Sequence, residues 1–322
     1  MSDRDPRRPL PRVVADGPLD QVIVSLLQDK VELLPWEVAT SGGPEAGSVL
    51  GLYTYGHPLV DGRMLDRLPE LRVISNYGVG VDHLDLAAAQ ARSIPVGNTP
   101  GVLESATADL GFALLLASAR RIVEGDRYAR SPEFLRYDPG FMLGREVHGT
   151  TLGIVGLGNI GAQVARRARG FDMEILYHNR RPRTEPEFEQ GARYVPFDEL
   201  LARSDFVMLT VPLTDQTRGL IDAKALSKMK PTAILVNLAR GPVVRTDDLL
   251  DALKAGWIAG AALDVTDPEP LPRDHGLLRL DNVVITPHLG SASDRTRRRM
   301  AEVSVENLLA GLQGQPLPHR VG

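Results

Sequence analysis

Three short motifs place an arginine, a glutamate and a histidine shortly after runs of apolar residues. Arg240 follows the run 233–236, Glu269 follows the run 259–263, and His288 follows the run 283–285. The carboxyl ends of parallel strands meet at the ligand-binding edge of an open α/β sheet, so we expect the three side chains to gather there. An arginine can bind a carboxylate bidentately, and a histidine can donate a proton to a carbonyl oxygen while a glutamate stabilises the imidazolium. Such a set suits the reduction of a 2-oxo acid, although each residue alone could be a surface or turn residue.

A glycine-rich motif earlier in the chain predicts a binding site for a dinucleotide. It lies between a predicted strand at 152–155 and a predicted helix at 159–169. In this setting the first glycine makes a tight turn, the second lets the backbone approach a pyrophosphate, and the third lets helix and strand pack closely. The helix N-terminus then faces the anion. The motif reads Gly156-Leu157-Gly158-Asn159-Ile160-Gly161.

The end of the next predicted strand, 173–177, bears on the choice of cofactor. Sites selective for NAD usually carry an acidic residue about twenty positions beyond the first glycine, where it binds the ribose 2′-hydroxyl. Here Asn179 is followed by Arg180, Arg181 and Arg183. Guanidinium groups match a 2′-phosphate that a carboxylate would repel, so we expect NADP(H) to be preferred, with NAD(H) possible. Arg180 is the first candidate for this contact, Arg181 the second, and Asn179 the candidate for the ribose. The alternative is a solvated basic loop without selectivity.

Apolar runs alternate with helical patterns along the whole chain, and this alternation predicts parallel sheets covered on both faces by helices. A first series ends near residue 101. A long predicted helix at 102–124 follows, and a second series begins near residue 151. Two α/β domains are therefore expected. Their predicted strands are 12–16, 48–53, 71–75 and 94–96 in the first series and 152–155, 173–177, 206–210, 233–237, 259–265 and 283–285 in the second; further helices are predicted at 84–92, 245–255 and 291–312.

The composition excludes several classes of protein. The 322 residues carry a net charge of −4 and no cysteine. The charge argues against a dedicated nucleic-acid binder, and without cysteine there can be no disulfide, thiolate zinc site or Cys nucleophile. We expect no metal. We also expect no membrane association, because the longest apolar runs are too short to span a bilayer. The absence of cysteine suits a reducing compartment, so a cytoplasmic location is expected. The Arg- and Pro-rich residues 1–12 are interpreted as an N-terminal arm.

Several long motifs, in order and over nearly the whole chain, resemble the D-isomer-specific 2-hydroxyacid dehydrogenase family. The segment 76–85 is similar to the family's substrate loop, 153–161 to its cofactor loop and 211–217 to its P-L-T-x-x-T element. The segments 263–272, 287–293 and 307–312 resemble most the glyoxylate/hydroxypyruvate reductase branch. The resemblance implies two Rossmann-like domains, with the active site in the cleft between them. It assigns 1–101, completed by 288–322, to the substrate domain and 102–287 to the dinucleotide-binding domain.

The resemblance also implies roles for individual residues. Arg240 would bind the substrate carboxylate together with the backbone NH groups of Val79 and Gly80, His288 would be the general acid, and Glu269 its partner. Further substrate contacts would come from Leu52, Ser291 and Tyr137. The implied cofactor-binding residues are Thr107, Gly156, Leu157, Gly158, Asn159, Ile160, Gly161, Asn179, Arg180, Arg181, Val211, Pro212, Thr217, Leu238, Ala239, Asp264 (at the nicotinamide carboxamide), His288 and Gly290.

The motifs predict an NADPH-dependent reductase of small 2-oxo acids. The resemblance implies that the substrates are glyoxylate and hydroxypyruvate and that the protein forms a homodimer through its dinucleotide-binding domains. Phe134 and Tyr137 stand where the branch often carries tryptophans that reach the neighbouring subunit's pocket, so substrate preference could differ. The alternatives are the same fold acting on another substrate, such as 2-ketogluconate, phosphite or formate, and a non-catalytic protein that senses a dinucleotide. Glu269 argues against formate, because formate enzymes of this fold normally carry Gln there.

Overall fold

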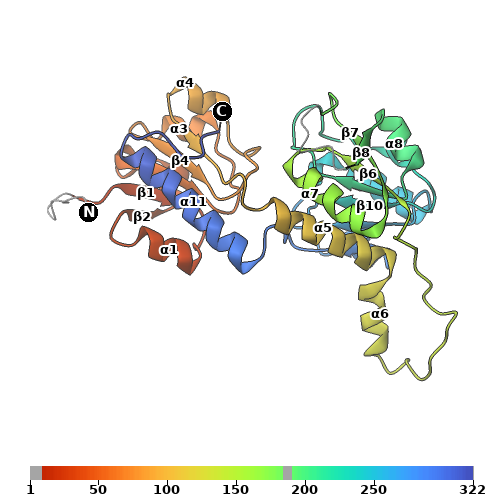
Figure 1. Ribbon diagram of the computed structural model, residues 1–322. Coiled ribbons are helices and arrows are strands. Elements are labelled where there is room, and N and C mark those ends of the chain that lie inside the picture. The colour runs from red at the N-terminus through yellow and green to blue at the C-terminus, as the bar shows by residue number, and fades with distance from the viewer. Residues whose placement is uncertain (1–8, 184–190, 322) are drawn as a thin grey trace. The chain divides into compact units, whose positions relative to one another are not determined.

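The computed structural model describes residues 9–183 and 191–321 of the chain, so most of the predicted N-terminal arm lies outside the described residues. The chain divides into two compact units, one formed by the residues up to Leu103 together with those from Ser293 onward, and the other by Glu104–Ala292. Each unit contains one parallel sheet (Figure 1), which confirms the prediction of two parallel-sheet α/β domains. The divisions fall at 103/104 and 292/293, later than the expected 101/102 and 287/288, so His288 belongs to the same unit as Arg240 and Glu269.

The first unit is built around a five-stranded parallel sheet. Its strand order is β2-β1-β3-β4-β5, with β1 at Arg12–Ala15, β2 at Glu32–Pro35, β3 at Val49–Thr54, β4 at Val73–Asn76 and β5 at Val96–Gly97. The helices are α1 (Gln21–Leu27), α2 (Glu37–Ser41), α3 (Gly62–Asp66), α4 (Leu86–Ala91) and α11 (Asp294–Leu312). Side chains of β3 and β4 are buried almost throughout, as expected for central strands covered on both faces.

Short polar caps and one long helix complete this unit. Asp61 and Asp85 accept hydrogen bonds of 2.8 Å from Met64 N and Ala88 N, which satisfies amide groups at the starts of α3 and α4. The helix α11 lies against β3, β4 and α1, so the last helix of the chain covers the sheet formed by the first hundred residues (Figure 1). Its apolar face includes Met300, Val303 and Leu308, which are buried.

The second unit is built around a seven-stranded parallel sheet with the order β12-β11-β10-β9-β6-β7-β8. Its strands are β6 (Thr151–Val155), β7 (Glu174–His178), β8 (Ala192–Tyr194), β9 (Phe206–Leu209), β10 (Ile234–Asn237), β11 (Gly260–Leu263) and β12 (Val283–Ile285). Its helices are α5 (Glu104–Ala119), α6 (Ile122–Ala129), α7 (Asn159–Ala168), α8 (Phe197–Arg203), α9 (Ala223–Leu226) and α10 (Thr246–Lys254). The chain reverses its direction of travel across the sheet between β6 and β9, and the loop after a strand at such a point is where open α/β sheets bind ligands.

The single helix predicted at 102–124 is wrong, because the structure has two helices there. The helix α5 ends at Ala119, and α6 begins at Ile122 after Arg121, whose φ of 52° is left-handed. The break is explained by the segment at Gly144 and Arg145, which comes back to contact the end of α5. Arg145 N donates a hydrogen bond of 2.7 Å to Ala119 O, and a Cβ at Gly144 would lie only 2.5 Å from the same oxygen. With its carbonyl bound by Arg145, α5 does not continue, and α6 projects away from the sheet (Figure 1).

Candidate active site

The three motifs proposed for catalysis occupy neighbouring loops of the second unit. The loops follow β10, β11 and β12, which lie side by side in the sheet, so Arg240, Glu269 and His288 come from its same edge. The first two loops are in direct contact, since a Cβ on Gly241 would lie 1.8 Å from Thr266 O. Only glycine allows that approach, and it draws the arginine loop against the loop that carries Glu269.

Glu269 and His288 form a hydrogen-bonded pair. The distance from His288 Nδ1 to Glu269 Oε1 is 2.8 Å, and the side chains are 33% and 40% exposed, respectively. Burial acts to raise the pKa of Glu269. The hydrogen bond and charge of His288, a backbone hydrogen bond at Thr266 and the charge of Arg240 outweigh burial, so the pKa lies below its ordinary value. Glu269 is therefore a carboxylate at neutral pH, and the electrostatic influence of Arg240 places all three residues in one site.

Asp264 has a positioning role that the sequence reasoning did not identify. It is 3% exposed and follows β11 directly. Its Oδ1 accepts hydrogen bonds of 2.7 Å from Thr286 Oγ1 and 2.7 Å from Leu289 N, and its Oδ2 accepts one of 2.8 Å from Gly290 N. The backbone NH of His288 also donates to Asp264 O at 2.9 Å. These bonds hold His288 in its left-handed conformation, with φ at 55°, a conformation that costs a non-glycine residue free energy.

Arg240 is held by the end of its own strand. The side chain of Asn237 donates to Arg240 O at 3.0 Å and accepts from Ala239 N at 3.0 Å. Arg240 Nη1 donates to Ala239 O, also at 3.0 Å. Asn237 is buried. The buried amide therefore fixes the turn from which the guanidinium extends.

The glycine-rich loop has the geometry that its sequence predicts. Gly156 has a φ of 103° and Gly161 packs so closely that a Cβ there would lie 2.5 Å from Gly156 O. At Gly158 an added Cβ would meet no atom within 4 Å. The loop leads into α7, whose first residue is Asn159, while Ile160 packs on the apolar core. The open space at Gly158, at the N-terminus of a ten-residue helix, fits a pyrophosphate.

The basic segment after β7 contacts this loop through residues that differ from those expected. Asn179 Oδ1 accepts from Leu157 N at 2.6 Å and Asn179 Nδ2 donates to Leu157 O at 3.2 Å, so this amide braces the loop itself. Arg183 Nε also donates to Leu157 O, at 2.9 Å. Arg180 and Arg181 are exposed, and Arg180 Nη1 reaches Gln216 Oε1 at 3.3 Å. Arg183 thus contacts the phosphate loop, a role that the charge pattern alone did not single out.

The other residues assigned to the cofactor fall into two groups. Thr107 lies beside Gly290, Val211 beside Gly156, and Leu238 and Ala239 are nearly buried at the end of β10. Pro212 and Thr217 form a turn that closes on itself. Thr217 Oγ1 donates to Pro212 O at 2.6 Å and accepts from Thr214 N at 2.8 Å. That hydroxyl therefore stabilises the turn. The turn presents the exposed ring of Pro212 at its surface.

The expected substrate loop lies in the first unit, after β4. The carbonyls of Gly78, Val79 and Gly80 all accept hydrogen bonds from neighbouring groups. The backbone NH groups of Val79 and Gly80 have no hydrogen-bond partner among the described residues. Successive backbone amides without partners are the donors from which anion-binding sites are built. The loop therefore has donors suited to a carboxylate.

One substrate contact predicted from the resemblance needs correction. Leu52 is fully buried and packs within the core of the first unit, so it offers no surface to a ligand. Among the residues that follow β3, Tyr55 and His57 are partly exposed. Ser291 is partly exposed next to the His288 loop. Tyr137 is 82% exposed on the segment after α6.

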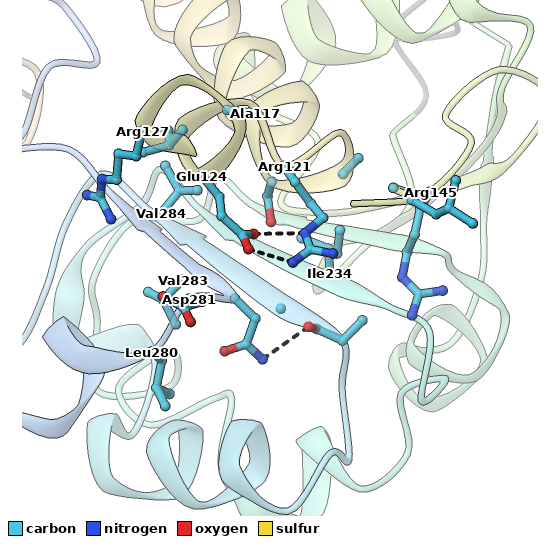
Figure 2. A pocket seen from close by; sticks show the side chains of 18 residues that line it. Ala117, Arg121, Glu124, Arg127, Arg145, Ile234, Leu280, Asp281, Val283 and Val284 are labelled. Carbon is cyan, nitrogen blue, oxygen red and sulfur yellow. Dashed lines mark hydrogen bonds and ion pairs between the residues drawn. The ribbon is translucent and has the colours of Figure 1, made fainter. Parts of the chain in front are cut away.

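A cavity of about 280 Å³ lies at the opposite edge of the second unit's sheet from the catalytic residues (Figure 2). Ile234, Gly260 and Val283, the first residues of β10, β11 and β12, line it, whereas the catalytic loops follow the last residues of these strands. Arg121 and Glu124 face it as an ion pair, with the shortest N–O distance 2.6 Å. The cavity is therefore not part of the candidate active site.

Within the described ranges, no helix is both long and apolar enough to cross a membrane. In the same residues, no group of three or more His, Cys, Asp or Glu side chains is arranged to hold a metal ion.

The fold, the phosphate loop and the Arg–Glu–His set define the class of protein. The family model of the D-isomer specific 2-hydroxyacid dehydrogenase NAD binding domain matches residues 112–290. The chain belongs to this family, which confirms the resemblance seen in the sequence.

Individual relatives are similar over most of the chain. A glyoxylate reductase of Pyrococcus furiosus is 45% identical over 317 residues, 96% of this chain and 94% of the relative, and one of Korarchaeum cryptofilum is 52% identical over 263 residues, 81% and 79%. Among solved structures, the NADPH-dependent glyoxylate/hydroxypyruvate reductase of Sinorhizobium meliloti, in complex with NADP and malonate, has a TM-score of 0.89 at 32% identity, covering 97% of both chains.

Proposed function

We propose that this protein reduces small 2-oxo acids, glyoxylate and hydroxypyruvate, to 2-hydroxy acids with NADPH. The observation that carries the proposal is the His288–Glu269 hydrogen bond, held within the electrostatic reach of Arg240 at the ligand-binding edge of the sheet. The relatives named glyoxylate reductase support the substrate class. An ordinary surface histidine would not need a buried aspartate to fix its loop.

We assign a separate role in the reaction to each of these residues. Arg240 binds the substrate carboxylate with two parallel hydrogen bonds, and the NH groups of Val79 and Gly80 are assigned to the same carboxylate. His288 uses Nδ1 for Glu269, so Nε2 is the nitrogen that donates a proton to the carbonyl oxygen. Glu269 stabilises the imidazolium before the transfer. The nicotinamide, when bound, supplies the hydride.

The phosphate loop and the basic segment after β7 support the cofactor assignment. Gly158 leaves room for a pyrophosphate, and no acidic residue stands at the end of β7. Arg180 and Arg181 are exposed beside the loop, where a 2′-phosphate would find guanidinium donors. We assign Arg183 the further task of fixing Leu157 through its 2.9 Å bond to the carbonyl.

A steady-state assay tests both parts of the proposal. The purified protein is mixed with NADPH or NADH and a panel of 2-oxo acids that includes glyoxylate, hydroxypyruvate and 2-ketogluconate, and the loss of absorbance at 340 nm is followed. We expect turnover of the two smaller acids with NADPH. Arg180→Ala should raise the KM for NADPH and leave that for NADH unchanged, with Arg193→Ala, an arginine of β8, as the control. Turnover of no acid would refute the enzyme assignment, and a preference for NADH would refute the role of Arg180.

We also propose a homodimer formed through a segment that we call the arm, residues 122–146. Of the fifteen large hydrophobic side chains exposed in the described residues, seven lie on the arm, and α6 contributes no buried residue. Tyr128 packs against Phe134 and Phe141, with ring centroids 5.6 and 4.7 Å apart, so the arm is held together by its own aromatic residues. An apolar surface of this density is typical of a contact with another protein. The cavity in Figure 2 adjoins this apolar surface through Val123, Leu143 and Arg145, and we propose that the second copy covers the cavity and the arm.

Because a protein without cysteine suits a reducing compartment, a cytoplasmic location is part of the proposal.

A further inference from the structure

The carbonyl groups of the loop at 78–80 are held by two asparagine side chains that the catalytic proposal does not use. Asn76 Nδ2 donates to Gly78 O at 3.0 Å and to Gly80 O at 2.9 Å. Asn98 Nδ2 donates to Val79 O at 2.9 Å. Three consecutive carbonyls are thus drawn toward the two amides. In so short a loop, fixing the carbonyls also fixes the directions in which the intervening NH groups point.

The orientation of the Asn76 amide follows from its surroundings. Two carbonyl oxygens can be met only by its NH₂ group, which has two hydrogens to donate. Its Oδ1 then accepts from Thr54 Oγ1 at 2.8 Å. Thr54 and Asn76 are paired in the register of β3 and β4, and both are fully buried. The amide cannot turn without leaving buried polar groups unpaired, a change that costs free energy.

The backbone of Asn98 is fixed by the C-terminal part of the chain. Its backbone NH donates to His319 O at 3.1 Å, and its carbonyl accepts from Asn307 Nδ2 at 2.9 Å. Asn307 lies on α11, is fully buried, and also accepts from His319 N at 3.0 Å. The last helix and the C-terminal segment therefore hold the backbone of Asn98, which in turn directs its side chain to Val79 O.

The usual ligand position of such a sheet is occupied by the protein itself. In a sheet of order 2-1-3-4-5, ligands bind beside the ends of β1 and β3. Here Asp16, directly after β1, accepts hydrogen bonds from the backbone NH groups of Tyr55 and Gly56 after β3. The amides at that point are therefore satisfied. Those of Val79 and Gly80, one strand further along, are the ones without a partner among the described residues.

We propose that Asn76 and Asn98 are positioning residues that keep the NH groups of Val79 and Gly80 turned toward the substrate carboxylate. The inference rests on the proposed function, because it concerns the same 2-oxo acid. The two amides never touch the substrate. They remove the alternative in which the carbonyl groups of the loop face the anion and repel it, so the donors are in place before binding and less ordering is needed at that step.

Substitutions of the asparagines test the proposal through the kinetic constants. Asn98→Ala should raise the KM for glyoxylate about tenfold, the effect of one lost hydrogen bond of ordinary strength. Its kcat should stay within about threefold and its Kd for NADPH within about twofold, since neither hydride transfer nor the dinucleotide depends on the loop. Asn76→Asp, which places a carboxylate oxygen against two carbonyls, should raise the KM further. Asn282→Ala is the matched control, because Asn282 Nδ2 also donates to a backbone carbonyl, Ala259 O, at 3.1 Å in the other unit.

A binding measurement separates this inference from the proposed function. The whole chain, labelled with ¹⁵N at valine and glycine, is titrated with oxamate, and the amide signals of Val79 and Gly80 are followed. We expect both to shift in the wild type, and Asn98→Ala to need about tenfold more oxamate. If the wild type turns over no 2-oxo acid but shows these shifts, the proposed function fails and the inference stands. An unchanged KM and oxamate affinity in both variants would overturn the inference, as would a parallel loss of kcat and NADPH binding.

Discussion

At the residue scale, the proposed chemistry depends on a histidine whose backbone is held in an unfavourable conformation. His288 has a φ of 55°, and Asp264 stabilises that conformation by accepting hydrogen bonds from the NH groups of the next two residues, Leu289 and Gly290. Strain of this kind persists only where the surroundings over-determine it. In return, Nδ1 lies 2.8 Å from Glu269, and the opposite ring nitrogen is directed away from the carboxylate. The arrangement is suited to repeated donation of a proton in one direction.

Removal of the imidazole tests this role directly. His288→Ala should lower kcat for glyoxylate by roughly two orders of magnitude or more, the range ascribed to general acid catalysis. The KM for NADPH should change little. His148→Ala is the control, because His148 is 68% exposed and is paired with Asp172 at 3.1 Å, outside the catalytic loops. Turnover within about threefold of the wild type in the His288 variant would remove that residue from its assigned role.

The carboxylate beside the imidazole should set the pH dependence of the reaction. The pKa of Glu269 is lowered, so its contribution to the stability of the folded state is present above the ordinary carboxyl pKa and is lost as the pH falls through the lowered value. At working pH the group is an anion, the form that best accepts the hydrogen bond from His288 Nδ1. The rate should therefore decline on the acid side, as the pH falls through the lowered pKa of Glu269.

In Glu269→Gln this decline at low pH should be absent, because an amide does not titrate. We expect kcat/KM for glyoxylate to be about tenfold below the wild type at pH 7, since the hydrogen bond to His288 loses its charged partner, with a smaller deficit as the pH falls through the lowered pKa of Glu269. Glu199→Gln, which removes a carboxylate paired with Arg203 at 2.7 Å, is the matched control. A deficit independent of pH would show that Glu269 acts by position alone.

At the scale of elements, the glycines of the phosphate loop separate a binding role from a folding role. Gly158→Ala adds a Cβ where no atom lies within 4 Å, so the variant should fold with an unchanged Tm. The KM for NADPH should rise about tenfold or more, because the methyl group enters the space assigned to the pyrophosphate. Thermal unfolding and initial rates are measured on the same preparation.

Gly161→Ala is the counterpart of that variant. Its Cβ would lie 2.5 Å from Gly156 O, a backbone atom that cannot move aside easily. Overpacking of this kind typically costs about 1–3 kcal/mol, so the Tm should fall by several degrees. Equal Tm values for the two variants, or an unchanged KM for NADPH in Gly158→Ala, would contradict the division of roles.

The comparison of sequence with structure shows which elements local patterns can define. Strands such as β6 and β10 were predicted within one residue of their ends, because they are apolar on both faces and end in recognisable loops. The break after Ala119 was not, because its cause is a hydrogen bond from Arg145, which no local pattern around residue 120 records. The arginine, glutamate and histidine that we propose for catalysis were predictable as strand-end motifs. The bracing by Asp264, Arg183 and the two asparagines was not, since each bond joins residues that only the folded chain brings together.

At the scale of the whole molecule, the arm carries large hydrophobic side chains that a single copy of the chain leaves exposed to solvent. Leu135 is 87% and Leu143 73% exposed, on a segment held together by the ring contacts of Tyr128. Burial of apolar surface is worth about 25 cal/mol per Å², so several such side chains can contribute substantially to association. Two negative charges placed among them should oppose it, because buried charges without partners are costly.

The double variant Leu135→Glu/Leu143→Glu should therefore convert a dimer into a monomer. Light scattering coupled to size-exclusion chromatography, at the same protein concentration for each sample, gives the mass. Leu59→Glu is the control, since Leu59 is 70% exposed but belongs to the first unit and not to the arm. If Tyr137 reaches the partner's substrate site, as the resemblance implies, the monomer should also show a raised KM for glyoxylate while NADPH binding is retained. A double variant that stays dimeric would show that another surface forms the dimer. A wild type that is monomeric would show that no second copy covers the arm.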